Sequence, residues 1–168
     1  MTLLKQKTID EKIAYFNGFL STIAILDTIA CRAMCEYFIE PIEDKGSIDA
    51  TLQHHYTAFF MLVNAHVLPN TPLYSVENIE YLKLQDWQEI LKHTIQSWCI
   101  DTGFGSNQFK TVQQQSELID LFMKKLANVF SGAVEVWEVF NGATDVYYKE
   151  YIFGDTHQYF LLHFGIND

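Results

Sequence analysis

The hydrophobic period of the sequence changes at Gly132, and this change limits the folds that are open to the chain. Before this glycine, apolar residues recur at spacings near three and four, which is typical of helices that bury one face. After it, β-branched and aromatic residues dominate and the period becomes two, as in strands. Helices followed by strands favour an α+β protein over the alternating βαβ order of a parallel sheet.

The helical part is expected to hold about four helices. A Thr8-x-x-Glu11 capping-box pattern opens the first, and Ser47 or Asp49 can cap the second. Pro41 and the polar residues after it should end the first helix. The predicted helical regions cover about 9–40, 47–68, 75–100 and 118–129.

Three strands are expected over residues 134–140, 146–153 and 158–164. Asn141-Gly142 and Gly154-Asp155 mark the two connections, which are short enough to favour antiparallel pairing. The prediction is an α+β fold in which about four helices are followed by a three-stranded antiparallel β-meander at the C-terminus. No long linker interrupts the chain, so residues 1–168 are expected to form a single domain, with a helical part (1–131) and an antiparallel sheet (133–168).

Charge excludes direct binding to nucleic acid. The 168 residues carry a formal net charge of -10, and only Arg32 among the 11 basic residues is an arginine. Binding to a phosphate backbone is driven by Lys and Arg, whereas an acidic surface attracts a basic partner. The first residues contain no secretory signal, and the uncharged stretch over 13–26 is shorter than the roughly 20 residues that span a bilayer. We therefore expect a cytoplasmic protein without a membrane partner.

Catalytic and metal-binding patterns are weak. Cys31 and Cys35 share a helical face, but two further ligands for a zinc site are missing. The sequence has no phosphate-binding loop, and no catalytic residue, metal or cofactor is predicted. One alternative is an enzyme that uses Cys99 with His93 or His163. Another is a helical domain whose aromatic side chains line a cavity for a small molecule or cofactor.

The sheet segment is the more acidic part of the chain. Residues 1–131 and 132–168 each carry a net charge of -5, although the second segment has only 37 residues. Aromatic side chains rimmed by carboxylates are typical of protein-binding surfaces. The carboxylates would supply negative charge complementary to a basic partner, and the aromatic side chains would be the residues that anchor the contact. The candidate partner-binding residues are Glu135, Trp137, Glu138, Asp145, Tyr147, Glu150, Tyr151 and Asp155.

The C-terminal segment, with YYKEYIF over 147–153, GDTH over 154–157 and QYFLLHFG over 158–165, resembles bacterial immunity proteins of polymorphic or contact-dependent toxin systems. The resemblance covers about 30 residues, and it implies a non-catalytic inhibitor that binds a cognate toxin domain, commonly a basic nuclease. The expected function is therefore neutralisation of a basic toxin domain through an acidic, aromatic surface. Whether copies of the chain associate through the sheet edge is left open.

Overall fold

The computed structural model describes residues 8–66, 73, 75, 79–101, 111–130, 132–142, 147–155 and 158–167. Its helices are α1 (Ile9–Cys31), α2 (Ile48–Ala65), α3 (Trp87–Ile95) and α5 (Val112–Ala127), and a short π-helix, η1 (Gln96–Asp101), continues α3. The strands are β1 (Met34–Ile42), β2 (Tyr81–Leu84), β3 (Glu135–Val139), β4 (Tyr147–Gly154) and β5 (Tyr159–Asn167).

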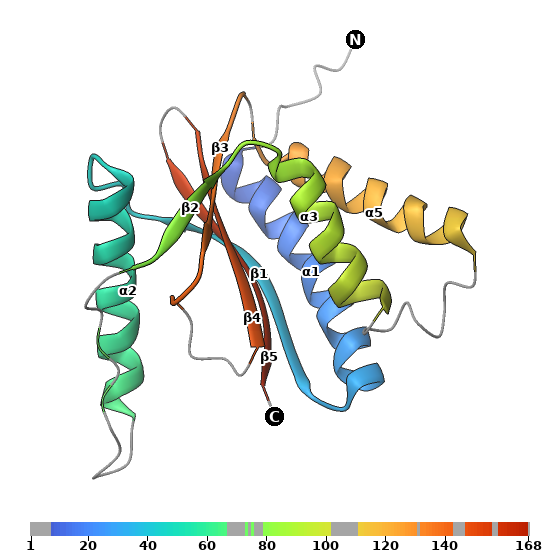
Figure 1. Cartoon of the computed structure of the whole chain (residues 1–168), viewed down its shortest axis with the longest axis horizontal. Helices are drawn as coiled ribbons and strands as arrows, with labels where there is room; N and C mark the ends of the chain where they lie inside the picture. Colours follow the sequence, from blue (N-terminus) through green and yellow to red (C-terminus); the bar gives the residue numbers. More distant parts are fainter. Residues whose placement is uncertain are drawn as a thin grey trace.

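The strands form one antiparallel sheet in the order β1-β5-β4-β3-β2 (Figure 1). The protein is therefore α+β, but the predicted three-stranded meander is wrong. The three expected strands are present as β3, β4 and β5, and they form only the middle of the sheet. β1 adds to β5 on one side and β2 adds to β3 on the other, so both edge strands come from the part of the chain that was predicted to be helical.

The first helix ends nine residues before its predicted end, at Cys31. Arg32 adopts a left-handed conformation with φ 59°, and its N–H donates to the carbonyl of Thr28, which closes the helix. The nine residues of β1, Met34–Ile42, alternate between the two sides of the sheet. This period of two was the overlooked signal for β1.

The starts of the first two helices were predicted correctly, whereas α5 begins at Val112, six residues before its predicted start. Thr8 and Glu11 form the reciprocal hydrogen bonds of a capping box, and Ser47 caps α2 by accepting from the N–H of Ala50. These caps depend on neighbouring residues only, so the sequence is sufficient to find them. The third predicted helical region is wrong at its start, because its residues 81–84 form β2 before α3 begins at Trp87.

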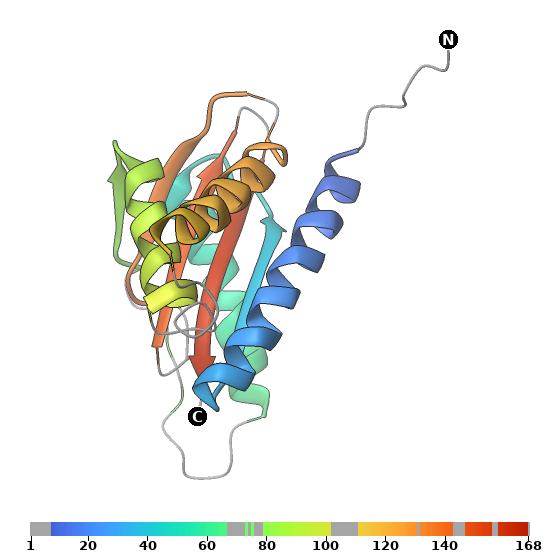
Figure 2. The same cartoon turned by 90° about the vertical axis from the view of Figure 1, so that its right-hand side faces the viewer.

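The sheet separates two layers of helices. In Figures 1 and 2, α1, α3 and α5 lie on one face and α2 lies on the other. The larger core cluster fills the first face, where Phe122, Tyr151, Phe153 and Phe164 are almost completely buried. A smaller cluster around Leu52, beneath α2, leaves part of the second face open to a cavity.

α1 is also long and apolar enough to cross a membrane, by length and composition alone. Its buried side, which includes Phe16, Leu20 and Ile23, packs into the larger core cluster. Core helices satisfy the same length and composition criteria, so this property is weak evidence for a membrane span.

A buried hydrogen bond ties the end of α1 to β1 and gives a test of this packing. The Tyr37 hydroxyl donates to Oδ2 of Asp27 at 2.8 Å, and both residues are buried. We expect Tyr37→Phe to lower the free energy of unfolding by about 1–2 kcal/mol, because a bond to a buried acceptor is lost. Urea unfolding measures the change. Tyr15→Phe makes the same chemical change at an exposed residue and should have an effect of less than about 0.5 kcal/mol. Equal effects of the two variants would contradict this account.

Candidate functional site

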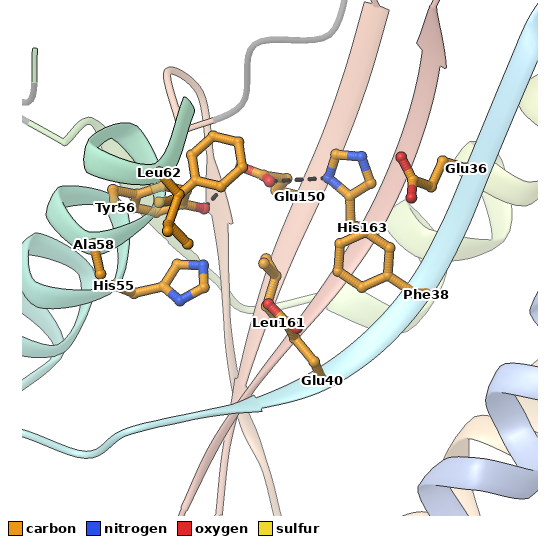
Figure 3. Close-up of a pocket in the computed structure, with 11 residues that line it drawn as sticks. Glu36, Phe38, Glu40, His55, Tyr56, Ala58, Leu62, Glu150, Leu161 and His163 are labelled. Atoms are coloured by element: carbon orange, nitrogen blue, oxygen red, sulfur yellow. Dashed lines mark hydrogen bonds and ion pairs between the residues drawn. The ribbon is translucent and has the colours of Figure 1, made fainter. Parts of the chain in front are cut away.

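A cavity of about 470 Å³ lies between α2 and the sheet, and we call it the α2 hollow (Figure 3). Strand β1 supplies one wall, α2 supplies the facing wall, and β4 and β5 supply residues between them. The volume falls in the range of about 300–1,000 Å³ that is common for small-molecule sites. The lining residues are Glu36, Phe38, Glu40, His55, Tyr56, Ala58, Phe59, Leu62, Glu150, Leu161 and His163.

Strand register places three of these side chains in one row. Phe38 on β1 is paired with His163 on β5, and His163 is paired with Glu150 on β4. Directly opposite residues in antiparallel strands project their side chains from the same face and lie close together. The Phe38 ring accordingly stacks on the His163 ring with centroids 4.8 Å apart.

Glu150 is the centre of a buried hydrogen-bond chain. The Tyr56 hydroxyl donates to Oε2 of Glu150 at 2.7 Å, and Nδ1 of His163 lies 2.9 Å from Oε1. Because an ionised carboxylate can only accept, the second contact requires the proton on Nδ1. All three residues are buried, so the chain fixes α2 against the middle of the sheet.

Burial shifts the titration of two residues that line the hollow. Loss of water lowers the pKa of His55 below its ordinary value, although the charge of Glu150 acts in the opposite direction. Burial also raises the pKa of Glu40; His163 opposes this shift and Glu150 adds to it. The Glu40 side chain lies at the exposed rim of the hollow. Lowering the pKa of His55 favours its neutral form at neutral pH.

The hollow is built to attract positive charge. Glu36, Glu40 and Glu150 contribute three carboxyl groups, and no Lys or Arg is among the described residues that line it. Aromatic residues stand beside the carboxyl groups, and ring faces attract cations by their quadrupole. Glu150 is already engaged by Tyr56 and His163, which leaves the rim residues Glu36 and Glu40 better placed to meet an incoming group.

The predicted partner-binding residues do not form one surface. Trp137, Glu138, Glu150 and Tyr151 are buried, and by strand alternation Glu138 and Tyr151 lie on the opposite face of the sheet from Glu150. Tyr151 belongs to the larger core cluster, where its hydroxyl lies 2.7 Å from the Thr94 hydroxyl. Of this buried group, only Glu150 lines the α2 hollow.

The remaining predicted residues lie elsewhere. Glu135 and Tyr147 are exposed, and Asp155 organises the turn between β4 and β5 by accepting from the N–H of Gln158. Asp145 lies outside the described residues. Two of the carboxylates are paired within the chain, Glu135 with Lys83 and Glu138 with Lys149, which reduces the charge they offer to a partner.

The residues weighed for catalysis are also dispersed. Cys99 is buried in the core, and burial raises the pKa of its thiol, which disfavours the nucleophilic thiolate. His93 is exposed on α3, whereas His163 lies in the hollow beside Glu150. In the part of the chain that the structure describes, no group of three or more His, Cys, Asp or Glu residues is placed to hold a metal ion.

Glu36 and Glu40 were missed as site residues by the sequence analysis, which placed them in a helix. Their signal was the alternation of Glu36, Phe38 and Glu40 with the buried residues Cys35, Tyr37 and Ile39. That pattern predicts a strand with one polar, aromatic face. It does not predict that this face lies beside Glu150, which is more than 100 residues away in the sequence.

The fold and the α2 hollow together define an α+β protein with an acidic, aromatic-lined cavity against one face of its sheet. The sequence matches no protein-family model, and it has no match among curated proteins. Among solved structures, citrus MAF1 aligns with a TM-score of 0.46 and 12% sequence identity, over 93% of this chain and 98% of that chain. A likeness of this size says nothing about function.

Proposed function

We propose that this protein is a non-catalytic binding protein that neutralises a basic protein partner. The α2 hollow carries the proposal, because it combines three carboxyl groups with aromatic walls and has no described lining cation. The toxin domain implied by the resemblance to bacterial immunity proteins is the partner class that we propose, with the cytoplasm as the place of action. The exposed Glu135 and Tyr147 can contribute to the same contact only if the partner also reaches their part of the sheet.

Electrostatics supports this choice of partner. A chain with a formal net charge of -10 speeds the approach of a positively charged domain and repels acidic ones. Within that general field, the hollow concentrates carboxyl groups beside apolar surface, with Glu150 buried and Glu36 and Glu40 at the exposed rim. The net charge of the chain would steer the basic partner towards the protein, and the hollow would provide a specific point of contact.

Partner capture at several salt concentrations tests the proposal. The full chain should capture a basic protein from its native cells, and the affinity of the purified pair should fall at least about tenfold between low and high salt, because screening weakens the attraction. Affinity that does not change with salt, or capture of an acidic partner, would overturn the proposed function. A captured toxin domain should also lose its activity when the complex forms.

The size of the hollow favours a second candidate function, the binding of a small organic cation. A volume of about 470 Å³ is sufficient for a metabolite-sized molecule. Native mass spectrometry of the protein purified from its source should then show an added mass that disappears on denaturation. A preparation that carries no added mass and takes up no metabolite from a cell extract would count against this candidate.

A further inference from the structure

We infer that the α2 hollow receives the end of one arginine side chain from the basic partner. This inference rests on the proposed function and assigns its point of contact. Arginine fits the site because its planar guanidinium can donate to carboxylates and stack on aromatic rings at the same time. The hollow offers both kinds of group, with Glu36 and Glu40 at the rim and Phe38 and Phe59 among its walls.

The geometry of the hollow favours a single charged group on an apolar stem. Leu62, Leu161 and Phe59 line the cavity and can contact methylene groups, while Glu40, which is paired with Leu161 across β1 and β5, meets the charge. Figure 3 shows Glu36 and Glu40 on the β1 side of the space, with His55 facing Glu40 from α2 and Glu36 lying beyond His163. β1 and α2 would therefore contact the arginine side chain from two sides.

The two histidines that line the hollow, His55 and His163, do not supply the positive charge that the arginine would bring. His55 is held towards its neutral form by burial, and Nδ1 of His163 is engaged with Glu150. Burial disfavours the ionised form of Glu40, so a cation beside that residue would lower its pKa. Binding of the guanidinium and ionisation of Glu40 are therefore expected to support each other.

A pair of small probes tests the inference directly. N-acetyl-arginine methylamide carries the guanidinium, and N-acetyl-citrulline methylamide has nearly the same shape without the charge. In NMR titrations of the full chain, the arginine probe should shift the resonances of Leu62, Leu161 and His163, and it should bind at least about tenfold more tightly than the citrulline probe, as loss of a charge-assisted contact predicts. The carboxyl resonance of Glu40 should titrate at lower pH when the arginine probe is bound. Equal binding of the two probes, or shifts confined to residues outside the hollow, would overturn the inference.

Substitutions on β1 and just beyond its end distinguish the contribution of the hollow to probe affinity from the contribution of the protein's net charge. Glu40→Gln should weaken the arginine probe at least about fivefold, because one charged acceptor is lost. Glu43→Gln removes the same charge from an exposed residue that does not line the hollow and is paired with Lys45, so it should change the affinity less than about twofold. Similar effects of the two variants would mean that net charge, and not the hollow, governs binding.

The partner distinguishes this inference from the proposed function. If the captured basic protein binds the Glu36→Gln, Glu40→Gln double variant as tightly as the unmodified chain, arginine insertion is wrong while salt-sensitive partner binding stands. If the double variant loses at least about tenfold in affinity and Glu117→Gln, an exposed change on α5, does not, the hollow is the contact point. If no basic partner is captured but the arginine probe binds in the hollow with the expected selectivity, the proposed function fails and the cation site belongs to the second candidate.

Discussion

Replacing Glu150 by alanine is expected to lower the free energy of unfolding by about 3 kcal/mol, because two buried groups lose their shared acceptor at about 1–3 kcal/mol each. The Tyr56 hydroxyl and Nδ1 of His163 both use the Glu150 carboxylate, and all three residues are buried. The variant also leaves a void beside α2, which adds to the cost. Urea unfolding followed by tryptophan fluorescence measures the change.

Two further variants identify the cause of this effect. Glu135→Ala removes an exposed carboxylate that pairs with Lys83, and it should cost less than about 1 kcal/mol. Glu150→Gln keeps an oxygen that can accept from Tyr56 and should have an intermediate effect. A Glu150→Ala variant that is as stable as Glu135→Ala would show that the Tyr56–Glu150–His163 chain contributes little to the fold.

Gly142→Ala is expected to destabilise the protein by about 1–3 kcal/mol through overpacking. A Cβ atom at this position would lie 2.3 Å from Cζ of Tyr56 and 2.5 Å from Oε2 of Glu150. Neither neighbour can move away easily, because both side chains are buried and hydrogen-bonded to each other. The glycine therefore allows the backbone after β3 to cover the Tyr56–Glu150 bond.

Gly18→Ala provides a matched control for this substitution. Gly18 lies within α1, and a Cβ atom there would meet nothing within 4 Å. Alanine should therefore stabilise the protein by about 0.5–1 kcal/mol, since glycine weakens a helix interior. The two variants should shift the urea midpoint in opposite directions. A shift in the same direction would mean that Gly142 is not tightly packed.

The sequence was sufficient to predict those parts of the fold that depend on residues close together in the chain. The capping residues of α1 and α2, the strands β3, β4 and β5, and the antiparallel connections between these strands all follow from short patterns. The segment after Cys31 was missed because its apolar content was read as a continuation of the helix. Its period of two was present but was overlooked, and tertiary pairing with β5 makes it a strand.

The candidate site was harder to predict because strand pairing between distant segments has no local signature. Residue types in the last 37 residues indicated an acidic, aromatic segment, but they did not show that Tyr151 and Glu138 face the helices on one side while Glu150 faces α2 on the other. Which face is covered depends on where the helices pack, and this is a property of the whole chain.

The amino-acid sequence by itself determined the α+β class, the strong acidity, the starts of α1 and α2 and the strands β3, β4 and β5, because these depend on composition and on residues close together in the chain. Tertiary structure alone decided that β1 lies beside β5 and that Glu36 and Glu40 share a cavity with Glu150 and His163. The physical reason is that an edge strand pairs with whichever partner lets it bury its apolar side, and the polar side is then carried to a place that no local pattern specifies.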